Sequence, residues 1–228
     1  MVFDASLKRR LTGAGALGIA ALSLAALPLT SPASTPASDA SGVDVLQFLS
    51  AHRHGILVAV VLNGLAWCAL MPAVFVGLRS LIGDAGRGAA TIACVAAAVE
   101  AALIGVALVF IATAAYAAPD LGAGSAKLFD DGFEVALVAS AWPTITCAVA
   151  LMFAAWRSRV LPVSIVLLGV AVVALHAVSA VSIARGGAFS PGGIAAAAPP
   201  LFAIWMAVVG ISVLRAPVRS SATVAVVS

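Results

Sequence analysis

Apolar residues follow one another along this chain in six runs, each about as long as an α-helix that crosses a bilayer. Such a helix needs about 20 mainly apolar residues, because the hydrocarbon core is ~30 Å thick and a helix rises ~1.5 Å per residue. The pattern therefore predicts an all-α fold, a polytopic membrane helix bundle with six transmembrane helices. The predicted spans are residues 11–30, 55–78, 89–117, 133–156, 161–184 and 193–214.

The segments between these runs are rich in polar residues, proline and glycine, which is typical of loops. Two of them are "SPASTPASDASG" after the first run and "PDLGAGSAKLFDDG" after the third. None leaves room for a separate soluble domain. We therefore expect residues 1–228 to form a single membrane domain.

Basic residues gather at one end of the predicted helices, the end that also holds both chain termini. Loops rich in lysine and arginine stay in the cytoplasm. Nine of the twelve basic residues lie on the side of the termini, so both termini are predicted to be cytoplasmic. The nine are Lys8, Arg9, Arg10, Arg79, Arg87, Arg157, Arg159, Arg215 and Arg219, and the other three are Arg53, Lys127 and Arg185.

The first apolar run has a second interpretation. Its basic start, its apolar stretch and the small residues Ser31 and Ala33 after it are also typical of a cleaved signal peptide. The apolar stretch from Leu11 to Leu29 is longer than the ~7–15 residues of most signal peptides, which favours a retained span. The other five spans keep their orientation under either interpretation.

A short amphipathic helix is predicted on the outer side, just before the second span. Ser41 and Asp44 have the spacing of a helix N-cap. Polar residues then recur at helical spacing opposite apolar ones, as on a helix that lies at the membrane interface. A simple extension of the second span is the alternative. The recurring polar residues are Asp44, Gln47, Ser50 and His54.

Composition agrees with a bilayer as the solvent of the fold. The chain of 228 residues is 63% hydrophobic and 9% charged, whereas soluble domains are about 45–50% apolar and ~25% charged. The net charge of +3 comes from basic residues scattered between apolar runs, with no basic face. We therefore expect the lipid bilayer, and no nucleic acid, as a partner.

Two short motifs resemble chemical sites but lack the context that those sites need. "GAGALG", residues 13–18, has the spacing of a dinucleotide fingerprint, but no strand precedes it, so we expect close helix packing and no nucleotide. His52 and His54 would point ~200° apart on a helix, which disfavours a metal site. No nucleophile–base or metal constellation can be assembled. We expect no cofactor, no metal and no enzyme activity.

Polar and aromatic residues inside the spans define the candidate site. Counted from the arginines at the inner helix ends, they lie at similar depths, near the membrane midplane or in the outer half. Glu100 has small residues on its helix face, and an ionisable group that faced lipid would cost ~2.5–3.5 kcal/mol, so we expect it to face the bundle interior. The candidates for ligand binding or proton coupling are Glu100, His176, Asn63, Trp67 and Trp142.

Glu100 allows two interpretations. As a neutral acid it could hydrogen-bond a polar group of another span and only hold two helices together. As a functional group it could bind a ligand or couple a proton, because intramembrane ionisable residues often mark such sites. The second, fourth and sixth spans each hold tryptophan and proline, so three bent helices could surround a cavity. The prolines are Pro72, Pro143, Pro199 and Pro200.

A resemblance is carried by "VDVLQFLSAHRHGILVAVVLNGLAWCALMPAVFVGLRSLI", together with the basic first span, the long outer loop and four further spans. In this layout the chain resembles an uncharacterised family of small six-span bacterial membrane proteins, a domain of unknown function. The resemblance implies an all-helical bundle in a bacterial cytoplasmic membrane. It implies no activity.

Two functions are therefore expected for a multi-pass protein of the bacterial cytoplasmic membrane. The first is binding or transport of a small or lipid-like molecule in a cavity lined by the candidate residues. The second is an accessory subunit that packs against another membrane protein or a further copy of itself. A cavity at the candidate residues would favour the first, and a dry core with small residues exposed to lipid would favour the second.

Overall fold

Every regular element is a helix in the part of the chain that the computed structural model describes, residues 4–30, 35–159, 161–182, 184, 187–191 and 193–216. The predicted all-α fold is thus confirmed for these ranges. Ser31, Ala33, Arg185 and Arg219, which entered the predictions above, lie outside them. The α-helices are α1 (Ala5–Thr30), α2 (Gly42–Asn63), α3 (Met71–Leu81), α4 (Arg87–Ala117), α5 (Ala123–Ser158), α6 (Val163–Ala180) and α7 (Ala198–Arg215).

Six segments of the described ranges are long and apolar enough to cross a membrane, which confirms the predicted number of spans. α2 and α3 form one of these segments, because a π-helical stretch, η1 (Gly64–Leu70), joins them without a break. Short 3-10 turns precede α4, α5 and α7: η2 (Asp84–Gly86), η3 (Ala118–Asp120) and η4 (Ile194–Ala197).

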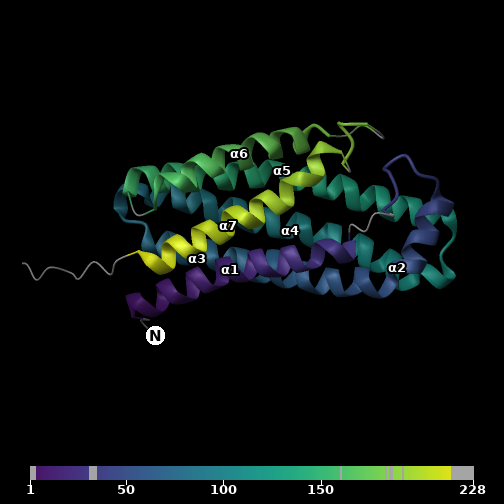
Figure 1. The fold of residues 1–228 in the computed structure, drawn as a ribbon, viewed down its shortest axis with the longest axis horizontal. Helices are drawn as coiled ribbons and strands as arrows, with labels where there is room; N and C mark the ends of the chain where they lie inside the picture. The colour runs from purple at the N-terminus through teal and green to yellow at the C-terminus, as the bar shows by residue number, and fades with distance from the viewer. Residues whose placement is uncertain are drawn as a thin grey trace, which may run out of the picture.

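The helices lie side by side along the long axis of the molecule (Figure 1). α4 packs against α5, α5 against α6, and α1 against α7. The start of α1 and the end of α7 lie at the same end of the bundle, together with the connections from α3 to α4 and from α5 to α6. Successive spans therefore run in opposite directions, as expected for six spans that cross one membrane.

α2 extends well beyond its predicted span. It begins at Gly42, so the residues predicted as a short amphipathic helix continue directly into the second span. The predicted N-cap is present: the Ser41 hydroxyl accepts from the Asp44 N–H at 3.3 Å, and the Asp44 carboxylate accepts from the Ser41 N–H at 3.3 Å. Two otherwise unpaired N–H groups at the start of the helix are satisfied in this way.

The prediction of a loop over "PDLGAGSAKLFDDG" is wrong for its last ten residues. α5 already begins at Ala123, ten residues before the predicted span. Lys127 pairs with Asp130 at 3.5 Å and with Asp131 at 2.9 Å, three and four residues further along the helix. Such spacings place opposite charges on neighbouring turns and stabilise a helix.

"GAGALG" serves close helix packing, as predicted. A Cβ atom on Gly13 would lie 2.6 Å from the side chain of Leu214 on α7, and one on Gly15 would lie 2.7 Å from Val74 on α3. From the other side, a Cβ atom on Gly210 would lie 2.8 Å from the carbonyl oxygen of Gly13. Small residues at these positions let the backbones of α1 and α7 approach each other.

The prolines that were predicted to bend three spans occupy different positions in them, and the bends at Pro72 and Pro143 remain predictions. Pro143 lies inside α5, and Pro72 directly follows the π-helical stretch η1. Pro199 and Pro200 instead stand in the first turn of α7. The missing N–H of a proline costs nothing there, because the first N–H groups of a helix have no intrahelical acceptor.

The larger of two apolar core clusters sits toward the end of the bundle that holds the start of α1. Trp205 and Phe202 of α7, Met71 and Phe75 of α3 and Ile165 of α6 are at most 1% exposed. Large apolar side chains are instead exposed around the outside of the bundle, where a membrane protein meets lipid. They include Val58, Val61, Ile92, Val95, Val109, Trp142, Leu167 and Val170.

Candidate binding cavity

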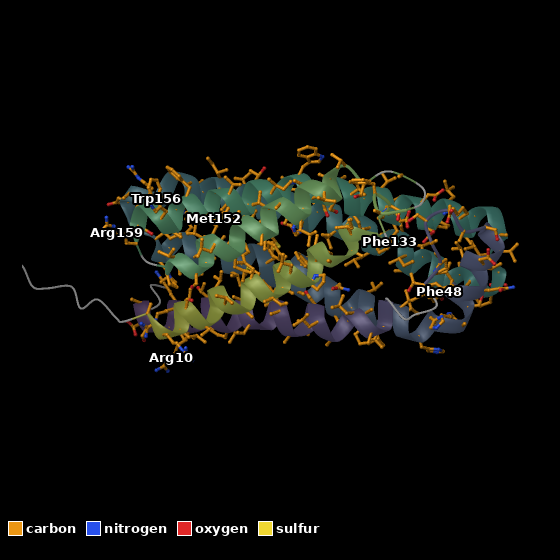
Figure 2. The ribbon with its side chains drawn as sticks, turned by 45° about the horizontal axis from the view of Figure 1, so that its top comes forward. Arg10, Phe48, Phe133, Met152, Trp156 and Arg159 are labelled. Atoms are coloured by element: carbon orange, nitrogen blue, oxygen red, sulfur yellow. The ribbon has the colours of Figure 1, made fainter. Side chains whose placement is uncertain are left out.

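A cavity of about 310 Å³ lies among the helices, and all six spans contribute to its lining. Along α4 the lining runs from Glu100 to Ile111, a length of ~16 Å at ~1.5 Å per residue. The middle of the cavity is apolar. Phe48 of α2 and Phe133 of α5 line its outer part, at the end of the bundle opposite Arg10 and Arg159 (Figure 2). The cavity is therefore elongated and reaches from the interior toward one end.

The structure brings four of the five candidate residues to this cavity, namely Asn63, Trp67, Glu100 and His176. They come from α2, η1, α4 and α6. Residues predicted at similar depths thus line one cavity, and the part of it that they line is called its deep part below.

Glu100 lies inside the bundle, as predicted, and is 1% exposed. It shares the buried face of α4 with Ala97 and Ala101, which lets α5 approach closely. Its Oε1 atom lies 2.7 Å from the Thr144 hydroxyl of α5. Its Oε2 atom is buried without a hydrogen-bond partner among the described residues.

The contact between Glu100 and Thr144 bears on whether the Glu100 carboxyl group is protonated. The Thr144 oxygen also lies 2.8 Å from the carbonyl oxygen of Ser140, one turn earlier on α5. A hydroxyl has a single proton to donate, and a carbonyl oxygen can only accept. A protonated Glu100 that donates to Thr144 leaves the Thr144 proton for the Ser140 carbonyl, whereas an ionised Glu100 has to share that proton with the carbonyl. The geometry therefore fits a protonated Glu100.

His176 is held in one orientation at the deep part of the cavity. It is 6% exposed, and its Nδ1 atom lies 2.8 Å from the carbonyl oxygen of Val172. Because the carbonyl must accept, Nδ1 carries the proton and donates, and Nε2 of the neutral ring is left as an acceptor. The ring packs edge-on against Phe202, with centroids 6.0 Å apart.

Trp67 and Asn63 reach the cavity from the irregular part of the second span. Trp67 is 6% exposed and lies in η1, where the N–H of Met71 donates to the carbonyl of Ala66, five residues back. Pro72, which has no N–H to donate, follows at once. π-helical turns are rare and occur frequently at functional sites.

The prediction that Trp142 lines the cavity is wrong. The side chain is 60% exposed on the outside of the bundle, and the cavity lining on α5 consists of other residues, Ala141 and Thr144 among them. Trp142 precedes Thr144 by two residues, which is ~200° around the helix axis. The sequence predicted the depth of Trp142 in the membrane, but not the direction in which its side chain points.

Two hydroxyl residues of the deep part were missed by the sequence analysis. Thr144 and Ser140 lie four residues apart and therefore on one helix face, which is a signal that could have found them. Ser23 of α1 lines the same cavity, is 8% exposed, and its hydroxyl has no hydrogen-bond partner within the described ranges. The first span thus also supplies a polar group.

The outer part of the cavity is acidic. Asp130 and Glu134 of α5 line it, next to the segment that precedes α2. The Ser38 hydroxyl donates to Glu134 at 2.7 Å, and Lys127 donates to the Ser38 carbonyl at 2.7 Å. One positive charge, Lys127, faces three carboxylates, those of Asp130, Asp131 and Glu134, so this cluster has a net charge of about −2 when all are ionised.

The fold is that of a multi-pass helical membrane protein with a polar site inside an apolar cavity. Comparison of the chain with protein-family models, with curated proteins and with solved structures gave no match. Functional conclusions therefore depend on the cavity itself.

Proposed function

We propose that the protein binds a small, lipid-like molecule in this cavity, as a binding or transport protein, and that it catalyses no reaction. The supporting observation is an elongated apolar cavity whose deep part holds a buried carboxyl oxygen, Glu100 Oε2, without a partner among the described residues. A buried polar atom of this kind costs about 1–3 kcal/mol if nothing ever bonds to it. A ligand with a hydrogen-bonding head and an apolar body would satisfy both features.

The cavity has the dimensions and composition of a ligand site. Small-molecule pockets are mostly apolar, contain a few convergent polar groups and measure about 300–1,000 Å³. This cavity, at about 310 Å³, stands at the small end of that range. An elongated molecule fits its shape better than a compact one.

The accessory-subunit alternative receives less support. It predicted a dry core and a stripe of small residues exposed to lipid. The stripe Ala97, Ala101 and Gly105 instead packs inside: Ala97 is 0% and Ala101 8% exposed, and a Cβ atom on Gly105 would lie 3.7 Å from Cys68 of η1. A homo-oligomer or a membrane-protein partner would have to use another face.

Filling the cavity should weaken binding. We expect Val60→Phe, on the lining of the cavity, to weaken binding of chain-bearing ligands at least about tenfold, because the phenyl ring occupies the apolar middle of the cavity. Val61→Phe places the same ring one residue further on, at a position 61% exposed on the outside, and should leave the affinity unchanged. The measurement is calorimetric titration of the detergent-solubilised protein with n-decanol, n-decylamine and decanoate. Equal affinities of the two variants for every ligand would contradict the proposal.

We further propose that both termini are cytoplasmic in a bacterial cytoplasmic membrane, so that the acidic part of the cavity faces outward. The support is the gathering of Arg10 and Arg159 at the end of the bundle opposite Phe48 and Phe133 (Figure 2). Reporter fusions at Ser228 and after Asp84 should show cytoplasmic activity, and a fusion after Lys127 should show external activity. External activity at Ser228 would overturn this orientation.

A further inference from the structure

We propose that the ligand of this cavity carries a positively charged, amine-type head, and that the head binds at Glu100 in exchange for the proton of its carboxyl group. The inference rests on the proposed function, because it concerns the same cavity, and it names the chemical class of the ligand.

The charges of the lining disfavour an anionic head. Its ionisable residues are Glu100, Asp130, Glu134 and His176, and no lysine or arginine of the described chain lines the cavity. A fatty-acid carboxylate or a phosphate would therefore enter an acidic cavity without a counter-charge, and an unpaired buried charge is strongly unfavourable. An ammonium group is instead attracted by the same acidic residues.

The deep part of the cavity offers an ammonium group both of the contacts that it prefers. Glu100 supplies a carboxyl oxygen without a partner in the described part of the chain, and this oxygen can accept an N–H. Trp67 lines the same part, and an indole ring attracts cations to its face. The hydroxyl of Ser23, which has no partner among the described residues either, can accept a further N–H.

The outer part of the cavity favours entry of the same class of ligand. Asp130, Asp131 and Glu134 outnumber Lys127 there, and an acidic entrance raises the local concentration of cations. The two parts are separated by apolar lining such as Ile104, Leu108 and Leu137, which suits an alkyl chain or ring attached to the ammonium group.

Thr144 allows Glu100 to exchange its proton for the ligand. The Thr144 oxygen lies 2.7 Å from Glu100 Oε1 and 2.8 Å from the Ser140 carbonyl oxygen, so a protonated Glu100 can donate to Thr144 while Thr144 donates to the carbonyl. When the ammonium binds, the carboxyl proton leaves to water through the cavity, and the Thr144 hydroxyl turns to donate to the carboxylate. One cation enters and one proton leaves, so the charge inside the membrane does not change.

Few other titratable groups face Glu100 from the surrounding helices. α5 contributes Cys147, whose thiol is close enough to interact electrostatically with the carboxyl group. α6 contributes His176, which lines the same cavity, whereas Cys68 of η1 is exposed and its thiol donates to the Ala101 carbonyl at 3.4 Å. In their neutral forms, none of these groups has a positive charge that could compensate an ionised Glu100. The ligand must therefore supply that charge.

The test compares three ligands that share one alkyl chain: n-decylamine, n-decanol and decanoate, titrated into the detergent-solubilised protein at neutral pH. Binding that Val60→Phe removes counts as binding in the cavity. We expect decylamine to bind at least about tenfold more tightly than the other two and to release close to one proton per molecule bound, seen with a pH indicator in weak buffer. Glu100→Gln should lower the decylamine affinity to that of decanol and release no proton.

Glu100→Gln should keep the fold, because an amide can still hydrogen-bond Thr144. Glu100→Asp retains a carboxyl group and should retain both the preference for decylamine and the proton release. Equal affinities of decylamine and decanol, or decylamine binding without proton release, would overturn the inference and leave the proposed function standing. Absence of any binding sensitive to Val60→Phe would instead overturn the proposed function.

Discussion

Replacing Trp205 with alanine is expected to lower the free energy of unfolding by about 3–5 kcal/mol, the range for removal of a buried aromatic side chain. Trp205 is 0% exposed, packs against Phe202 with ring centroids 5.5 Å apart, and donates from Nε1 to the carbonyl of Ile165 at 2.9 Å. It therefore joins α7 to α6 by both packing and a hydrogen bond. The loss should be visible in thermal or denaturant unfolding of the solubilised protein.

Trp142 provides the matched control. Trp142→Ala removes the same side chain from a position that is 60% exposed on α5, where the ring contacts lipid or detergent and little of the protein. We expect a change within about 0.5 kcal/mol. Trp205→Phe should fall between the two, because it keeps most of the packing and loses the hydrogen bond. Similar losses for the two alanine variants would show that the helices are not arranged as described.

The number of spans and their approximate positions followed from the sequence because a bilayer imposes a length. A helix that crosses the hydrocarbon core must be apolar over about 20 residues, whatever its neighbours are. The ends of the helices were less predictable. Charged residues such as Lys127 and Asp131 were assigned to a loop, yet they pair on successive turns of α5 and extend the helix beyond the predicted span.

The depth of the candidate residues in the membrane was predictable, but the rotation of each helix about its own axis was not. Depth follows from the rise per residue, so Glu100, His176, Asn63 and Trp67 were placed at one level, and the structure brings them to one cavity. Rotation of a membrane helix is harder to read, because lipid-facing and buried faces are both apolar. For Glu100 the small residues beside it marked the inner face, whereas nothing comparable marked the outward direction of Trp142.

The two interpretations of Glu100 lead to opposite expectations for Glu100→Leu. If Glu100 only holds α4 and α5 together, leucine should lower the free energy of unfolding by about 1 kcal/mol, the usual contribution of one hydrogen bond. The structure argues otherwise. Thr144 keeps its bond to the Ser140 carbonyl without Glu100, and Glu100 Oε2 is a buried polar atom without a partner in the described ranges.

We therefore expect Glu100→Leu to leave the stability unchanged or to raise the free energy of unfolding by about 1 kcal/mol, because an apolar side chain of similar volume removes a buried polar atom that has no partner in the described part of the chain. The same variant should lose binding of decylamine completely, since the carboxyl group is the proposed site of the ammonium head. Unfolding of the purified variant and titration with decylamine measure the two effects on one sample. A gain in stability together with a loss of binding would mean that Glu100 is present for its ligand, and a clear loss of stability would mean that it serves the packing of α4 on α5.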